Sequence, residues 1–197
     1  LGIFTVEYND LIEGRNYTVN ASFYDKAYMK KNDTDNFTTG YGRMGQFQYL
    51  QLLIDNAVLD KTYEVTLYEP ITFDEELDTG LMRIYTNFTL NMNGYAINAK
   101  GHCRIFNITG DNVILKNVIF LNGNVNGIHK DNTTYGGAIY WAGENGKITY
   151  CEFLDNNAFC GSAVYWSGVN GTIIASYFLN DGICDNGIFW TGKNGTI

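Results

Sequence analysis

A repeat of 24 to 25 residues constrains this chain of 197 residues more than any other feature. A motif that pairs an aromatic strand with a following Asn-Gly turn occurs three times, at Gly136–Ile148, Gly161–Ile173 and Asn186–Ile197. Its tryptophans, Trp141, Trp166 and Trp190, are separated by 25 and 24 residues. Self-similarity at a fixed period of this size is the signature of stacked repeat architectures.

The repeat also places other like residues in columns. One column consists of asparagines: Asn87, Asn112, Asn145, Asn170 and Asn194. Two residues earlier stand glycines: Gly110, Gly143, Gly168 and Gly192. A third column holds Phe120, Phe153 and Phe178. The step from Asn112 to Asn145 is eight residues too long, and the polar segment 123–134 is where we place the insertion.

Each repeat contains short apolar or alternating runs divided by Gly, Asn and Asp, and none contains a helix-length segment. At about 3.3 Å per strand residue, such a repeat makes one coil of three short strands and three turns. A propeller blade would need about 40 residues, and a leucine-rich repeat would show its own leucine pattern. The repeat therefore predicts an all-β fold, a parallel β-helix (solenoid) over residues 61–197, truncated at its C-terminus.

The two-residue period of a strand assigns each column to a face. Two columns are predicted to point inward: Phe106, Ile139, Val164 and Ile188, and then Ile108, Trp141, Trp166 and Trp190. The column between them is predicted to point outward: Asn107, Tyr140, Tyr165 and Phe189. We interpret the asparagine column as a ladder of stacked amides at a turn.

The N-terminal part lacks the repeat. Residues 1–45 are predicted to form an irregular β segment, with strands at Ile3–Tyr8 and Tyr17–Tyr24 and a loop at Lys30–Asn36. Residues 46–60 have the apolar spacing of an amphipathic helix, which we expect to cap the open end of the solenoid. A strand is expected at Thr62–Tyr68, before the acidic loop Asp74–Gly80.

Charge and hydropathy exclude some partners. The net charge of −8 argues against nucleic acid and anionic lipid. No apolar run reaches 18 residues, so no membrane insertion is expected within this fragment. The chain starts without a signal peptide and ends within a repeat, so we expect it to be a piece of a longer chain.

The four cysteines lack the spacing of a zinc site. Cys160 and Cys184 are one repeat apart, and adjacent strands lie about 4.8 Å apart, which is within reach of a disulfide. A Cys160–Cys184 disulfide is therefore a candidate, with buried thiols as the alternative for all four cysteines.

Segments 87–97 and 105–123, together with the helix at 50–57 and the strand at 63–67, resemble the large adhesin-like surface proteins of gut and rumen methanogenic archaea. Those proteins are similar to pectin-lyase-like right-handed parallel β-helices. The resemblance covers about residues 46–197. It implies a right-handed solenoid, the helix as its N-terminal cap, and an extracellular, cell-surface location.

Pectin-lyase-like β-helices include polysaccharide lyases and hydrolases. Such lyases bind calcium with clustered acidic residues and use Arg or Lys as a base, and hydrolases pair two carboxylates. The outward column from Asn107 to Phe189 offers neither. Arg104 is the one arginine within the clear repeats, and Asp155 is better interpreted as a turn residue. His102 and His129 are expected to be solvated loop residues, so we predict no catalytic residue, metal or cofactor.

The outward aromatic residues Tyr140, Tyr165 and Phe189 are the candidate ligand-binding residues, because aromatic platforms hold sugar rings. The alternative is that they simply pack along a β surface. Among nine Asn-x-Ser/Thr sequons, the best glycosylation candidates are Asn32, Asn36 and Asn132, which lie in predicted loops.

These observations favour a non-catalytic, cell-surface, adhesin-like β-helix that presents a binding face to a glycan or protein of another cell. A carbohydrate-active enzyme of the same fold and a purely structural surface stalk are the alternatives.

Overall fold

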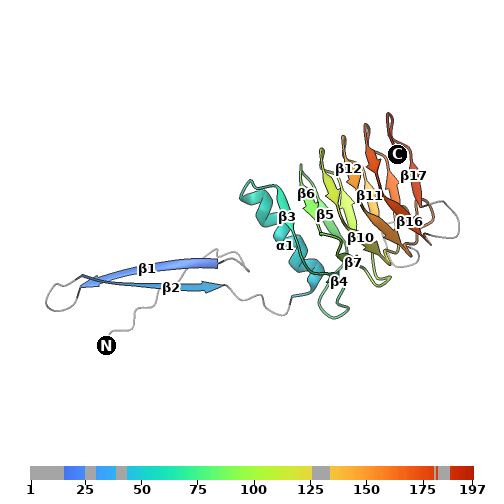
Figure 1. Cartoon of the computed structure of the whole chain (residues 1–197). Helices are drawn as coiled ribbons and strands as arrows, with labels where there is room; N and C mark the ends of the chain where they lie inside the picture. Colours follow the sequence, from blue (N-terminus) through green and yellow to red (C-terminus); the bar gives the residue numbers. More distant parts are fainter. Residues whose placement is uncertain (1–15, 25–29, 39–43, 126–133, 180, 182–186) are drawn as a thin grey trace. The chain divides into compact units, whose positions relative to one another are not determined.

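The computed structural model describes residues 16–24, 30–38, 44–125, 134–179, 181 and 187–197. The chain divides into two compact units, residues 1–43 and 44–197, and the second contains a stack of five coils (Figure 1). Each coil contributes one strand to each of three parallel five-stranded sheets. This arrangement confirms the predicted all-β parallel solenoid.

Sheet 1 contains β3 (Glu64–Thr66), β6 (Thr89–Asn91), β9 (Ile114–Lys116), β12 (Lys147–Thr149) and β15 (Thr172–Ile174). Sheet 2 contains β4 (Ile71–Thr72), β7 (Ala96–Asn98), β10 (Ile119–Leu121), β13 (Glu152–Leu154) and β16 (Tyr177–Leu179). Sheet 3 contains β5 (Met82–Ile84), β8 (Phe106–Ile108), β11 (Ile139–Trp141), β14 (Val164–Trp166) and β17 (Ile188–Trp190). We number the coils 1 to 5 from β3 to β17.

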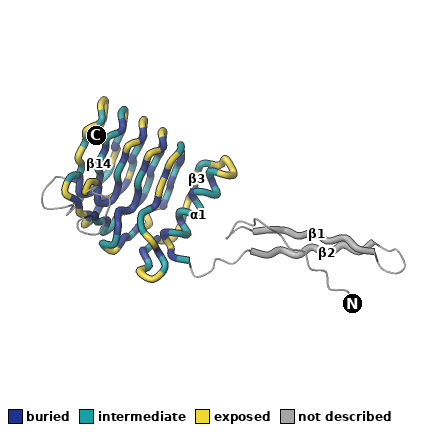
Figure 2. Tube along the Cα trace, turned by 180° about the vertical axis from the view of Figure 1, so that it is seen from behind, coloured by how far each residue is buried: buried dark blue, intermediate teal, exposed yellow. Residues whose placement is uncertain are grey.

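The register of sheet 3 matches the predicted columns. Tyr140 is aligned with Asn107 on one side and with Tyr165 on the other, and Tyr165 is aligned with Phe189. The neighbours of this column point inward, and Trp141 and Trp166 are completely buried. The interior of the stack is accordingly a continuous apolar core, whereas exposed residues gather at the corners (Figure 2).

Residues in the left-handed backbone conformation make the corners of the coils. In coil 4 they are Asn145 (φ 54°), Tyr150 (φ 52°) and Asp155 (φ 55°), placed before β12, between β12 and β13, and after β13. Asn and Asp adopt this conformation more readily than other non-glycine residues, which explains their abundance at turns. The interpretation of Asp155 as a turn residue agrees with this position.

The predicted asparagine ladder forms in the last three coils. Asn170 Nδ2 donates to Asn145 Oδ1 at 3.0 Å, and Asn194 Nδ2 donates to Asn170 Oδ1 at 3.2 Å. Asn87 does not share the left-handed conformation and instead accepts a bond from the adjacent Thr86 hydroxyl at 3.2 Å. Two further amide pairs, absent from the sequence interpretation, are Asn91–Asn117 and Asn98–Asn122.

The solenoid begins one coil earlier than the sequence columns indicate. The predicted strand at 62–68 corresponds to β3, which pairs with β6, and β4 and β5 complete coil 1. The loop of nine residues between β4 and β5 replaces the regular turn spacing there. Sequence comparison between repeats missed this coil because only its strand pattern, and not its turn residues, matches the others.

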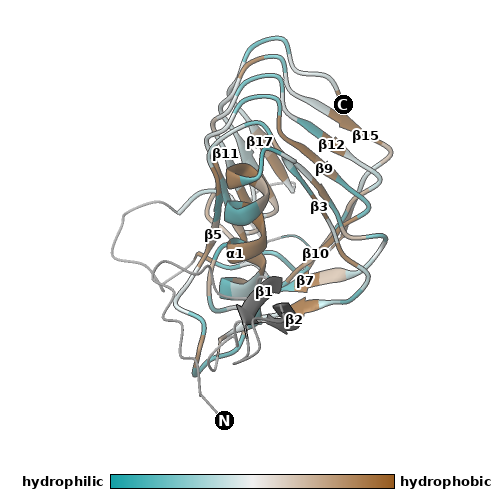
Figure 3. Ribbon diagram, turned by 90° about the vertical axis from the view of Figure 1, so that its left-hand side faces the viewer, coloured by the Kyte–Doolittle hydropathy of each residue, from teal (hydrophilic) through white to brown (hydrophobic). Residues whose placement is uncertain are grey.

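Helix α1 (Gln46–Leu59) lies across the first coil and contacts β3, β4 and β5 (Figure 3). Its apolar face is buried through Phe47, Leu50, Ile54 and Ala57. The predicted position of the helix as an N-terminal cap agrees with this packing. Burial of these side chains stabilises both partners, because neither the helix face nor the end of the core could remain in water at low cost.

Two glutamines of α1 satisfy the strand edges of coil 1. Gln51 Oε1 accepts a bond from Arg83 N at 2.6 Å, and Gln51 Nε2 donates to Arg83 O at 3.1 Å. Gln46 Oε1 similarly accepts from Thr72 N at 2.6 Å. The side-chain amides thus replace the peptide groups that a preceding coil would supply, which removes the hazard of an open sheet edge.

Gln51→Ala is expected to lower the free energy of unfolding by about 1–2 kcal/mol, because it leaves both backbone groups of Arg83 without their partner. The measurement is urea denaturation followed by circular dichroism. Gln48→Ala is the matched control, since Gln48 contributes its backbone N–H, not its side chain, to the bond with Asp78. Equal losses for the two variants would contradict the role of the Gln51 amide.

The N-terminal unit contains a two-stranded antiparallel sheet of β1 (Asn16–Tyr24) and β2 (Lys30–Thr38). Strand β1 agrees with the predicted strand at 17–24, whereas the expectation of a loop at Lys30–Asn36 was wrong. Strand pairing uses backbone groups, so a polar run of side chains does not prevent it. The strand predicted at Ile3–Tyr8 lies outside the described residues.

Candidate functional site

The three candidate binding residues form a ladder on the outer face of sheet 3. Tyr140 on β11, Tyr165 on β14 and Phe189 on β17 are aligned in successive coils. Tyr140 and Tyr165 are half-buried, and 37% of Phe189 is exposed. Tyr135, which follows the insertion, joins them by stacking on Tyr165 with 4.9 Å between ring centroids. We call these four residues the aromatic ladder.

The rings of the aromatic ladder stack face to face along the solenoid. Tyr140 and Tyr165 have centroids 5.2 Å apart and planes 12° apart, and Tyr165 and Phe189 have centroids 5.7 Å apart and planes 11° apart. Each inner ring therefore uses its faces for contacts with its neighbours. The surface that remains for a ligand consists mainly of ring edges and tyrosine hydroxyl groups, not of open ring faces.

Arg104 closes one end of the aromatic ladder. Its guanidinium carbon lies 5.5 Å from the centroid of the Tyr140 ring, at a cation–π distance. Its Nε donates to Gly136 O at 2.9 Å and its Nη2 to Tyr135 O at 2.7 Å, and only 4% of the residue is exposed. Arg104 thus fixes the chain that returns from the insertion against sheet 3. The sequence singled out this arginine without indicating its role.

The outward column of sheet 3 extends one coil further than the sequence indicated. Arg83 on β5 is aligned with Asn107 and is exposed. The column thus begins with a basic residue and continues through an amide to the aromatic ladder. Sequence reasoning missed Arg83 because coil 1 lies outside the visible repeat.

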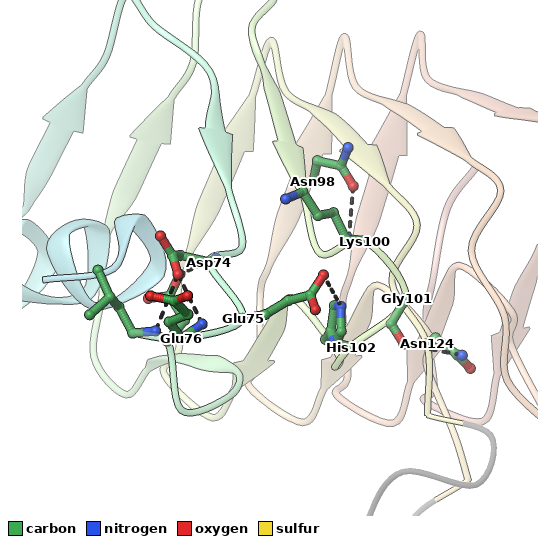
Figure 4. Close-up of polar contacts among 10 residues, drawn as sticks. Asp74, Glu75, Glu76, Asn98, Lys100, Gly101, His102 and Asn124 are labelled. Carbon is green, nitrogen blue, oxygen red and sulfur yellow. Dashed lines mark hydrogen bonds and ion pairs between the residues drawn. The ribbon is translucent and has the colours of Figure 1, made fainter.

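The long loops of the coils leave from the corner between sheets 2 and 3. An open groove of about 520 Å³ runs there across three coils, lined by Lys100, Gly101, Asn122, Asn124, Asp155 and Asn157. Asn124 Nδ2 donates to Gly101 O at 3.3 Å, which links two of these loops (Figure 4). The groove is polar and offers amides, one ammonium group and one carboxylate.

The acidic loop of coil 1 uses its charges locally. Asp74 Oδ1 accepts bonds from the N–H groups of Glu76 at 2.9 Å and Leu77 at 3.2 Å. Glu75 Oε1 lies 3.1 Å from Nε2 of His102, whose ring stacks on Phe73 (Figure 4). His102 is hence a packed and paired residue, not simply a solvated one; His129 lies outside the described residues.

Within the described residues, no group of three or more His, Cys, Asp and Glu side chains is arranged to hold a metal ion. The same part of the chain contains no helix with the length and apolar character needed to span a membrane.

Two of the cysteines have inert thiols. Burial raises the pKa of both Cys103 and Cys151 to about 12, so their reactive thiolate form is scarce at neutral pH. Cys160 forms a β-bridge with Tyr135. Cys184 lies outside the described residues, and the Cys160–Cys184 disulfide therefore stays a prediction.

The glycosylation candidates are differently placed from what the sequence indicated. Asn32 and Asn36 lie in β2, paired with Ser22 and Thr18 of β1, and not in a loop. Asn132 lies outside the described residues. Modification at any of the three stays a prediction.

Comparison with known proteins adds no identification: the sequence matches no family model, no curated protein and no solved structure.

Proposed function

We propose that this chain is part of a non-catalytic, extracellular surface protein that presents one side of a stiff β-solenoid to a glycan or protein of another cell. The observation that carries the proposal is the aromatic ladder, a row of partly exposed rings in successive coils. Aromatic side chains are enriched where proteins bind partners, because they offer large contact areas at low entropic cost. The adhesin-like, archaeal and cell-surface assignments rest on the sequence resemblance and belong to this proposal.

The ladder geometry specifies how such a partner would bind. Because the ring faces stack on one another, a glycan would lie along the solenoid axis and contact ring edges and the hydroxyl groups of Tyr135, Tyr140 and Tyr165. Neighbouring coils lie about 4.8 Å apart, so an extended chain would meet one ring per coil. Binding would accordingly depend on hydroxyl hydrogen bonds as well as on apolar contact.

Tyr140→Ala combined with Tyr165→Ala is expected to reduce binding to a glycan array and to whole cells at least tenfold, because it removes the centre of the ladder. Tyr140→Phe with Tyr165→Phe is expected to have an intermediate effect, since it deletes only the hydroxyl groups. Tyr177→Ala is the matched control, because Tyr177 is an exposed tyrosine on sheet 2. Unchanged binding by the alanine variant would refute the proposed binding face.

A structural surface stalk is the second candidate, and the ring stacking favours it. Faces that are used for contacts between coils stabilise the rod whether or not a partner binds. A polysaccharide-cleavage screen run beside the binding assays separates the candidates. Binding without cleavage supports the adhesin-like function, inactivity in both assays supports the stalk, and cleavage would establish the enzyme alternative.

A further inference from the structure

A chain of buried hydrogen bonds joins coils 3, 4 and 5 at the corner between sheets 2 and 3. Gly123, Asn156 and Asp181 occupy equivalent positions, each three residues after the aligned phenylalanine of sheet 2. Gly123 N donates to Asn156 Oδ1 at 2.8 Å, and Asn156 N donates to Asp181 Oδ1 at 2.9 Å. Each side chain therefore accepts the backbone amide of the preceding coil.

Asn156 and Asp181 differ in their second side-chain atom. Asn156 Nδ2 donates to the carbonyl of Phe120 in the preceding coil at 3.1 Å, and to Asp181 Oδ1 at 2.9 Å. Asp181 has an oxygen, Oδ2, in place of that nitrogen, and this atom is buried without a hydrogen-bond partner. The residue aligned with Phe120 in the coil before Asp181 is Phe153. By this equivalence Oδ2 faces the Phe153 carbonyl, where only a donor would be satisfied.

The surroundings of Asp181 favour the neutral carboxyl group. The residue is only 9% exposed, and burial is the largest cause that raises the pKa of its carboxyl group. The hydrogen bonds from Asn156 oppose this rise, and the negative charge of Asp155 adds to it. Among the described residues, Asp155 is the charged neighbour that acts on Asp181.

We propose that Asp181 takes up a proton on mild acidification and donates it from Oδ2 to the carbonyl of Phe153, so that coil 5 is held to coil 4 more firmly in acid than at neutral pH. A protonated Asp181 then makes the same bonds as Asn156 does one coil earlier. The corner of the last described coil becomes a pH-dependent connection in a stack whose other connections are fixed amides.

The sign follows from linkage between protonation and folding. The folded state binds the proton more tightly than the unfolded chain, in which the pKa of Asp is about 3.9. The stabilisation is thus fully present below that value and is lost as pH rises through the higher pKa of the folded state. A salt-bridged carboxylate would have the opposite dependence.

Hydrogen–deuterium exchange of the full chain tests the proposal, because it reports on individual coils. After correction for intrinsic rates, the amides of β13 and β16 are expected to be several-fold better protected at pH 5 than at pH 7.5. In Asp181→Asn the same amides are expected to be well protected at both pH values, since the amide donor is permanent. Asn already occupies the equivalent position in coil 4, so the substitution reproduces an existing arrangement.

Asp155→Asn is the control, because it removes the neighbouring charge without supplying a donor at position 181. It is expected to keep the direction of the pH effect but to shift it to lower pH. An equal pH effect in wild type and Asp181→Asn would overturn the proposal. So would protection of wild type at pH 7.5 on addition of Ca²⁺ alone, which would assign Oδ2 to a cation. A carboxyl ¹³C NMR titration that finds no raised pKa for Asp181 would also overturn it.

Discussion

Gly143→Ala is expected to lower the free energy of unfolding by about 3 kcal/mol or more, at the upper end of overpacking effects. A Cβ atom at Gly143 would overlap with the backbone carbonyl of Gly110 in the preceding coil. Gly168 and Gly192 meet the carbonyls of the preceding glycines in the same way. Because backbone ladders on both sides fix the coil spacing, the extra methyl group can be accommodated only by breaking hydrogen bonds of the corner.

Thermal and urea denaturation followed by circular dichroism would measure this loss. Ala142→Ser is the matched control, because Ala142 is adjacent, exposed and aligned with Ser167 of the next coil, so a hydroxyl group fits there. We expect its effect to stay within about 0.5 kcal/mol of wild type. If Gly143→Ala unfolded at the same urea concentration as this control, the glycine column would have no role in coil stacking.

Trp166→Ala is expected to cost about 3–5 kcal/mol, the usual range for a buried tryptophan. Its indole is completely buried between Trp141 at 4.2 Å and Trp190 at 4.6 Å between ring centroids, with planes 8° and 1° apart. Truncation would therefore leave a large cavity and remove two stacking contacts. In a solenoid the loss is transmitted only to adjacent coils, so coils 4 and 5 should unfold before coils 1 and 2.

Two further variants sharpen this test. Trp166→Phe keeps an aromatic ring and removes an indole N–H that is buried without a partner, so it should cost less than half as much as alanine. Phe189→Ala removes an outward ring of similar aromatic character and is expected to cost about 1 kcal/mol. Equal losses for Trp166→Ala and Phe189→Ala would contradict the assignment of the two columns to opposite faces.

The fold could be predicted because one period governs most of the chain. Ile139, Tyr140 and Trp141 alternate between core and surface, and the same alternation returns in the next two coils at unchanged spacing. Coil 1 and the strand β2 could not be predicted in this way. The former lacks the turn residues of the repeat, and the latter is defined by backbone pairing, which leaves little trace in polar side chains.

The candidate site could be predicted only in part. The strand period gives the face on which Tyr140 lies but not the orientation of its ring, and the stacking decides which part of the ring a ligand could reach. Arg104 was visible, yet its contact with Tyr140 depends on a loop that the repeat does not define. The equivalence of Asn156 and Asp181 remained hidden because the column contains a different residue in each coil, starting with Gly123.

The glutamines of α1 give the solenoid a direction. Gln46 and Gln51 already occupy the backbone groups of coil 1, so another β edge would have to displace the helix to pair at that end. The opposite edge keeps the register of the coils before it, and a duplicated repeat could join there or between existing coils without any change in the cap. Variation in rod length within such a lineage is therefore compatible with a constant N-terminal end, and the distance between that end and the aromatic ladder would be set by the number of coils between them.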